Sequence, residues 1–232
     1  MKRVLLKLSG EALANGSADI YDNAFLDKVA GSLVECANAG YELAIVVGAG
    51  NIWRGRQGGE MDRVTADRMG MLATLINSLC LKDAVIRKGG KAHVMSSVAM
   101  EPFAEGYSSE EADRYLKDGY IVIFGGGLGV PFLSTDTAGA VRASEIKADA
   151  MLMAKNVDYV YTDDPRKNPD AKKLESVKAS EVLAMNLKAI DATATAFCLS
   201  TGMPIRIFGF KNPEDIVRAV RGEISGTVIT PD

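Results

Sequence analysis

The amino-acid sequence predicts an α/β protein whose central sheet is largely parallel and covered by helices. Over most of the 232 residues, short apolar runs typical of strands alternate with segments of helical periodicity. Glycine clusters follow two of the apolar runs, as they do at strand-to-helix turns of such sheets. The length suits one sizeable domain, and no linker rich in proline or serine divides the chain.

Each element is predicted from a short apolar run or from apolar residues spaced three or four apart. Before residue 150 the expected order is strand 4–8, helix 25–37, strand 43–47, helix 64–84, strand 92–95, helix 110–118, strand 121–124 and helix 135–146. Beyond it we expect strands 151–154 and 157–161, a polar loop at 163–169, helix 191–200, strand 205–208, a helix after Pro213 and a strand near Val228. A boundary near residue 150 would divide one sheet, so we expect a single domain.

Composition narrows the chemistry that the chain can perform. The net charge of −3 disfavours a nucleic-acid binder, and the single histidine, His93, nearly excludes a histidine triad or a zinc site. No apolar stretch approaches the 18 residues of a membrane span, and Lys7 interrupts the apolar N-terminus. We therefore expect a cytoplasmic protein without a membrane segment, with Cys36, Cys80 and Cys198 as buried reduced thiols.

Nine of the 23 glycines lie in two clusters at predicted carboxyl ends of strands: Gly48, Gly50, Gly55, Gly58 and Gly59, and Gly125, Gly126, Gly127 and Gly129. Glycine there lets backbone N–H groups approach an anion, although tight turns without a ligand would use the same residues. Two cationic residues favour the interpretation that these loops bind an anion. Lys7 in an apolar strand is costly unless its ammonium reaches solvent or a negative group, and Arg54 could grip a phosphate with both arms of its guanidinium.

Two common nucleotide-binding motifs are missing from the sequence. The phosphate-loop pattern G-x-x-x-x-G-K-[ST] has no match in the chain. The segment at 48–53 begins like G-x-G-x-x-G but ends in Trp53 and follows the second predicted strand rather than the first. A dinucleotide-dependent dehydrogenase is therefore disfavoured.

Six segments, in chain order, resemble motifs of the bacterial uridylate (UMP) kinases, a branch of the amino-acid kinase superfamily. They are K-L-S-G-E-A-L at 7–13, G-A-G-N-I-W-R-G at 48–55, D-R-M-G-M-L-A-T at 67–74, P-F-L-S-T-D at 131–136, V-D-Y-V-Y-T-D-D-P at 157–165 and G-T-V-I at 226–229. The first, third and fourth together are specific to this branch. The resemblance implies a three-layer α/β/α sandwich, as in carbamate kinase, with ATP and UMP meeting at the carboxyl edge of the sheet.

The resemblance also implies a role for each matching residue, with a UMP half at about 1–150 and an ATP half at about 151–232 that do not form independent domains. The ATP site would comprise Lys7, Leu8, Ser9, Gly10, Gly50, Arg54, Lys155, Asn156, Tyr161 and Asp164. The UMP site would comprise Ala49, Asp67, Leu128, Gly129, Val130, Pro131, Phe132, Leu133, Ser134 and Thr135. The catalytic residues would be Lys7, Arg54, Asp136 and Asp191, with Mg²⁺ arriving on ATP and no resident metal site.

The chemistry of this reaction suits a chain with few proton-transfer groups. The acceptor is a phosphate oxygen whose second pKa lies near about 6, so it needs no general base at neutral pH. Positioning and charge stabilisation suffice. Asp136 or Asp191 could orient Lys7 or help to hold Mg²⁺ through water, although Asp136 could equally be an ordinary helix cap and Tyr161 a core residue.

Three departures from the family pattern bear on selectivity and regulation. Ala49 replaces a glycine, and Val130 replaces an asparagine next to the expected nucleoside. The loop at 14–21 lacks the glycine pattern that the family links to allosteric activation by GTP. We therefore expect weak or absent GTP activation, and inhibition by UTP stays open.

Two other functions compete with the kinase interpretation. One is an acylphosphate-forming relative such as acetylglutamate kinase, against which Asp67 and the segment 131–136 argue. The other is a nucleotide-sensing module without catalysis, against which Lys7, Arg54 and Asp136 argue. The resemblance further implies a homohexamer, and apolar residues around much of the helix at 64–84 favour an oligomer contact.

Overall fold

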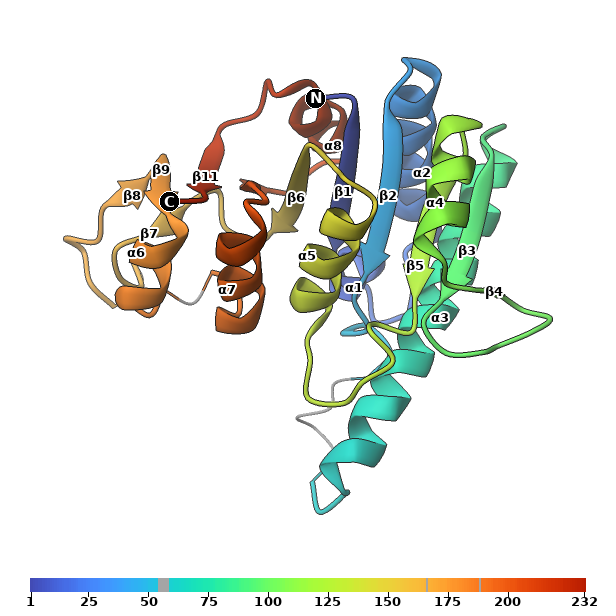
Figure 1. Ribbon diagram of the computed structural model, residues 1–232, viewed down its shortest axis with the longest axis horizontal. Coiled ribbons are helices and arrows are strands. Elements are labelled where there is room, and N and C mark those ends of the chain that lie inside the picture. The colour runs from blue at the N-terminus through green and yellow to red at the C-terminus, as the bar shows by residue number, and fades with distance from the viewer. Residues whose placement is uncertain (54–58, 166, 188) are drawn as a thin grey trace.

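The computed structural model of the protein describes residues 1–53, 59–165, 167–187 and 189–232. In this part of the chain a nine-stranded sheet has the order β4-β3-β5-β2-β1-β6-β10-β11-β9, and every neighbouring pair is parallel except β10 and β11 (Figure 1). The strands are β1 (Arg3–Leu8), β2 (Glu42–Val47), β3 (Ala92–Ser96), β4 (Glu105–Gly106), β5 (Ile121–Gly125), β6 (Ala150–Lys155), β9 (Ser176–Lys178), β10 (Ile205–Gly209) and β11 (Gly226–Thr230). The sheet is continuous across residue 150, because β6 pairs with both β1 and β10.

Helices cover both faces of this sheet, which confirms the predicted α/β/α sandwich (Figure 1). One face carries α2 (Asn23–Asn38), α3 (Arg63–Arg87) and α8 (Glu214–Arg221), and the other carries α4 (Ser109–Lys117), α5 (Thr135–Glu145), α6 (Ala179–Ala184) and α7 (Ala192–Thr201). The short α1 (Gly10–Ala14) follows β1 directly. Two apolar cores, one on each side of the sheet, bury the facing side chains.

Side chains alternate between the two faces of the sheet along β1 and β6, and this alternation determines on which face Lys7 and Lys155 lie. In β1, Leu6 and Leu8 enter the core under α2, whereas Leu5 enters the core under α5. Lys7 has the parity of Leu5, and Lys155 has the parity of Met153 in the same second core. Since successive strand residues point to opposite faces, both lysines lie on the α5 side. The two strands are adjacent and parallel, with Lys7 opposite Met153.

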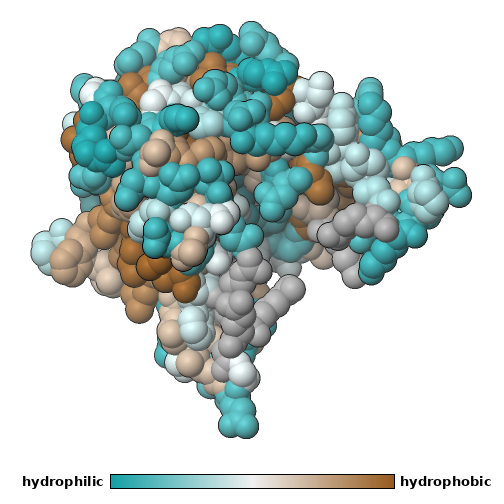
Figure 2. All heavy atoms as spheres, turned by 180° about the vertical axis from the view of Figure 1, so that it is seen from behind, coloured by the Kyte–Doolittle hydropathy of each residue, from teal (hydrophilic) through white to brown (hydrophobic). Residues whose placement is uncertain are grey.

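Helix α3 is long, and its apolar residues do not all face the sheet. Leu75 and Leu81 are buried, whereas Leu72 and Ile76 are 50% and 51% exposed. Figure 2, which views the molecule from behind, shows apolar side chains gathered above the projecting end of α3. Among the described helices, α3 has the length and composition of a membrane span, a test that the core helices of soluble proteins also pass.

The structure corrects the prediction for residues 157–161. Only Val160–Tyr161 (β7) is extended, and it pairs with Lys173–Leu174 (β8) in a separate two-stranded sheet. The N–H of Val160 donates to the Thr227 hydroxyl at 2.8 Å instead of entering the central ladder. The elements α1, α6, β4, β8 and β9 were not predicted, because each is short and contains at most three consecutive apolar residues.

The three cysteines are free thiols, and two of them lie where the sequence predicts. Burial raises the pKa of Cys36 to about 11 and that of Cys198 to about 12, which keeps both protonated and unreactive at neutral pH. Cys80 is only partly buried, so the prediction was wrong for this thiol. It lies on α3, near Tyr21.

Candidate active site

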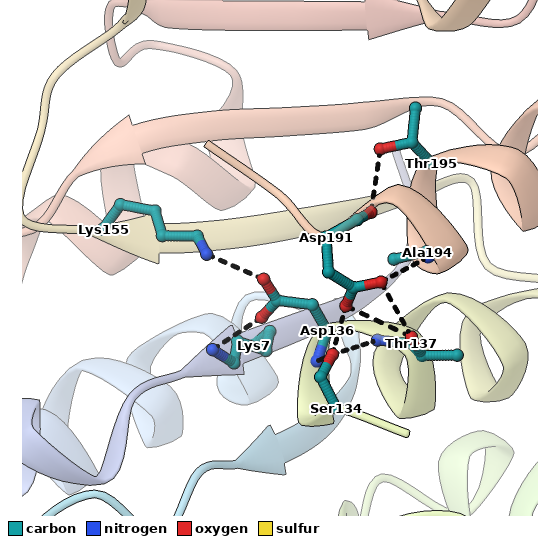
Figure 3. A network of polar contacts seen from close by, with 8 residues as sticks. All are labelled: Lys7, Ser134, Asp136, Thr137, Lys155, Asp191, Ala194 and Thr195. Carbon is teal, nitrogen blue, oxygen red and sulfur yellow. Dashed lines mark hydrogen bonds and ion pairs between the residues drawn. The ribbon is translucent and has the colours of Figure 1, made fainter. Parts of the chain in front are cut away.

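Three charged side chains meet at the carboxyl ends of β1 and β6, as Figure 3 shows. The Nζ of Lys7 lies 2.7 Å from one carboxylate oxygen of Asp136, and the Nζ of Lys155 lies 2.8 Å from the other. Asp136 stands in the first turn of α5, directly over the two strands. The two lysines thus share one carboxylate, which leaves the trio with a net charge of +1.

Because these three side chains are largely buried, water screens their charges poorly. Lys7 and Asp136 are only 7% and 8% exposed. Burial alone would raise the pKa of Asp136, but Lys7 and Lys155 outweigh it and hold that pKa below its ordinary value. For Lys155, burial dominates and lowers the pKa of the ammonium despite the nearby carboxylate. A buried site with one surplus cation suits a ligand that brings negative charge.

Asp136 is not the cap of α5, so the alternative that the sequence left open is wrong. Ser134 occupies the N-cap, and its hydroxyl accepts the N–H of Asp136 at 3.0 Å and that of Thr137 at 3.1 Å. Because Ser134 satisfies these amides, the Asp136 carboxylate is free to face the lysines. Its position is therefore set by charge pairing and not by capping.

Asp191 fixes the start of α7 against the start of α5. It is the N-cap of α7, accepting the N–H of Ala194 at 2.8 Å, and it also accepts the hydroxyls of Ser134 and Thr137. Figure 3 shows its carboxylate next to that of Asp136. The structure brings two of the predicted catalytic acids together, although 55 residues separate them in the sequence.

The glycine loops after β1 and β2 pack against each other with no room for side chains. A Cβ on Gly10 would lie 2.3 Å from the Asn51 amide oxygen and 2.6 Å from the Gly48 carbonyl. Asn77 of α3, fully buried, donates to the Gly48 carbonyl at 2.7 Å and to Asn51 at 2.8 Å, and accepts the Tyr21 hydroxyl. Sequence reasoning missed Asn77, whose signal was a polar residue on the buried side of an apolar helix.

A cavity of about 160 Å³ lies where the resemblance puts UMP. Seven residues of the predicted UMP set line it, namely Ala49, Asp67, Leu128, Val130, Leu133, Ser134 and Thr135. Gly129, Pro131 and Phe132 belong to the same loop without lining the cavity. The other lining residues were not predicted: Trp53, Ala66, Gly70, Met71, Thr74 and Gly127.

A larger cavity, of about 530 Å³, opens on the other side of the loop after β2. It is lined by Gly50 and Asn156 of the predicted ATP set, and by the unpredicted Phe210 and Lys211. Ala49 and Gly50 are consecutive and line different cavities, so this loop separates two neighbouring spaces.

The remaining predicted ATP residues are more dispersed. Leu8 is a core residue, and Ser9 caps α1 through its hydroxyl. Tyr161 lies in β7 and Asp164 in the turn after it, and neither lines the larger cavity. Arg54, predicted to act on the phosphates, lies outside the described residues.

Close-packed glycine loops and two lysines that share one carboxylate, at the carboxyl edge of a mostly parallel sheet, suit an α/β enzyme that binds phosphate groups. The model of the amino acid kinase family matches residues 2–209. Over its full length the chain is 39% identical to a UMP kinase from Bacillus anthracis, covering 96% of that chain with a TM-score of 0.94. It is 33% identical to the UMP kinase from Ureaplasma parvum, over 99% of this chain and 98% of that one, with a TM-score of 0.93.

An archaeal structure extends the comparison. The uridylate kinase from Archaeoglobus fulgidus is 26% identical over 99% of this chain and all of that one, with a TM-score of 0.75. The protein is thus an enzyme of the amino acid kinase family, and within it the chain belongs to the UMP kinases.

Proposed function

We propose that the protein transfers the terminal phosphoryl group of ATP to UMP, giving ADP and UDP for pyrimidine nucleotide synthesis. The observation that carries this proposal is the pair of cavities on either side of Ala49 and Gly50, whose linings include Thr135 and Asn156, the chain neighbours of Asp136 and Lys155. UMP would occupy the smaller cavity and ATP the larger one, with most UMP contacts before residue 150 and Lys155 and Asn156 beyond it. Both nucleotides share one domain.

The transfer step would rest on positioning and positive charge. The attacking UMP oxygen is already deprotonated at neutral pH, so no side chain has to accept its proton. Lys7 and Lys155 would face the negative charge that spreads over the transferring phosphoryl group. Asp136 would keep the two ammoniums apart at fixed positions, and backbone N–H groups of the glycine loops would hold the phosphates.

The activity implies Mg²⁺ together with ATP, but the acidic residues of the site are already engaged by groups of the protein. Both oxygens of Asp136 face lysines, and both oxygens of Asp191 accept hydrogen bonds from protein groups. No cluster of three His, Cys, Asp or Glu side chains occurs in the described parts of the chain. These carboxylates do not fit direct ligation, so phosphate oxygens of ATP and water would hold the ion.

A coupled ADP-release assay tests the proposal across UMP, CMP, dTMP and N-acetylglutamate. We expect turnover with UMP and its loss by about 100-fold or more in Lys7→Met, because this substitution removes a cation from the developing charge. Lys91→Met is the matched control, since Lys91 is exposed at the opposite edge of the sheet. Phosphorylation of the amino acid alone would favour an acylphosphate-forming kinase, and UMP binding without turnover would favour a sensing module.

Assembly, location and regulation complete the proposal. The exposed Leu72 and Ile76 on α3 support self-association, and we propose a homohexamer in the cytoplasm. Its mass by light scattering at micromolar concentration is the direct test. The glycine-poor loop at 14–21 supports weak or absent activation by GTP, and UTP is the effector to assay for inhibition.

A further inference from the structure

Asp67, a residue of the proposed UMP site, already holds two groups of the protein. Arg63, one helical turn earlier on α3, donates its Nε to both carboxylate oxygens, each at 2.9 Å. The backbone N–H of Phe132, 65 residues further along the chain, donates to Oδ2 at 2.8 Å. The Asp67 side chain is 15% exposed and lines the smaller cavity. One carboxylate thus joins α3 to the loop that walls this cavity.

Phe132 is held in a conformation that it would not adopt freely. Its φ is +70°, in the left-handed region, which costs a residue other than glycine about 1–3 kcal/mol unless its surroundings enforce it. Its ring is exposed, and the guanidinium carbon of Arg63 lies 5.6 Å from the ring centroid. Arg63 therefore contacts the ring directly and holds the backbone of Phe132 through Asp67.

We propose that Arg63 is a positioning residue for the nucleoside, and this inference rests on the proposed function. By fixing Asp67 and Phe132 it holds the loop 128–134 in place as the wall of the smaller cavity. A carboxylate has about four acceptor positions, so Asp67 can hold this loop and still accept a hydroxyl of the ligand. Without Arg63 the carboxylate can turn and Phe132 can leave its left-handed conformation, so affinity for UMP should fall while the phosphate chemistry stays intact.

The test replaces Arg63 and follows binding without turnover. Trp53 is the sole tryptophan, lines the cavity and donates its indole N–H to the Ala66 carbonyl at 2.9 Å, so its fluorescence should report UMP binding in the absence of ATP. Arg63→Gln should raise both the Kd and the KM for UMP about tenfold, equivalent to about 1.4 kcal/mol. The kcat and the KM for ATP should change less than about twofold, because uniform binding is lost and transition-state binding is kept.

Two further variants make the outcome specific. Arg63→Lys keeps the charge over the ring but lacks the planar guanidinium, and it should fall between the wild type and Arg63→Gln. Arg68→Gln removes an exposed arginine from the same helix and should bind UMP like the wild type. Wild-type affinity in Arg63→Gln, or a fall in kcat with the KM unchanged, would overturn the positioning role. A wild-type protein that neither binds nor phosphorylates UMP would refute the proposed function itself.

Discussion

Replacing Asp136 by asparagine tests whether charge balance at the lysine pair supports both folding and activity. The native trio sets one carboxylate against two ammoniums, at 2.7 and 2.8 Å. Asparagine has nearly the same shape, so the substitution changes charge without opening a cavity. It leaves Lys7 and Lys155 facing each other with no anion between them.

The size of the effect follows from burial. The side chains of Asp136 and Lys7 are about one-tenth exposed and that of Lys155 is 22% exposed, so water screens the lost attraction poorly. Removing one partner of a buried ion pair costs about 3–5 kcal/mol. For a chain of this length each kcal/mol corresponds to about 2–4 °C, so the melting temperature should fall by about 6–20 °C.

Lys155→Met is the matched control for this substitution. It also removes one charge, but it leaves Lys7 and Asp136 as a balanced pair, so its cost in unfolding free energy should be smaller. Both variants should lose UMP-dependent ADP release by about 100-fold or more, since both disturb the cations that we propose to face the transferring phosphoryl group. Guanidinium unfolding at neutral pH and the coupled assay measure the two effects. The charge argument is refuted if Asp136→Asn unfolds within about 1 kcal/mol of the wild type, or if Lys155→Met is the less stable variant.

Two further predictions concern pH and glycine. Burial opposes ionisation of Asp136, but the lysines keep its pKa below 3.8, so its contribution to stability is complete above that pH and is lost as the pH falls through the folded-state value. The difference in unfolding free energy between the wild type and Asp136→Asn should therefore be constant from about pH 5 to about pH 7 and should decrease below about pH 4. A difference that is unchanged at about pH 3 in denaturant titrations would contradict this prediction. Gly10→Ala should abolish activity, because its Cβ would meet the Gly48 carbonyl at 2.6 Å. Gly31→Ala, with open space around it in α2, should instead stabilise the protein by about 0.5–1 kcal/mol in the same measurements, and an active Gly10→Ala enzyme would show that the two loops can separate.

Elements with a continuous apolar run, or with a helical period over several turns, were predictable from the sequence. The run at 43–47 and the helix at 64–84 lie within β2 and α3 as the structure has them. The hairpin of β7 and β8 was not predictable. Val160–Tyr161 has the sequence pattern of the end of an apolar strand, but it pairs with Lys173–Leu174 and bonds to Thr227 instead of joining the central sheet. The pattern of a single apolar run does not show which segment the run pairs with.

The candidate site, like the fold, was predictable only in part. The resemblance assigned both Lys7 and Asp136 to the catalytic residues, and the structure places them in contact. It grouped Lys155 with ATP, but the contact of Lys155 with Asp136 depends on β6 lying next to β1, which a single sequence does not show. Asn77 was missed because its role depends on the Gly48 carbonyl and the Asn51 side chain, both in a loop far from it in the sequence.

Helix α3 supports both of the loops that we propose to bind the nucleotides. Asp67 holds the loop at 128–134, and Asn77 holds the loop after β2. Ten residues separate them, which is about 15 Å along one rigid rod. If α3 tilted about its buried end, Asp67 would be displaced further than Asn77. The proposed nucleoside wall and the proposed phosphate loop are therefore mechanically coupled through α3, and a displacement of this helix would move both.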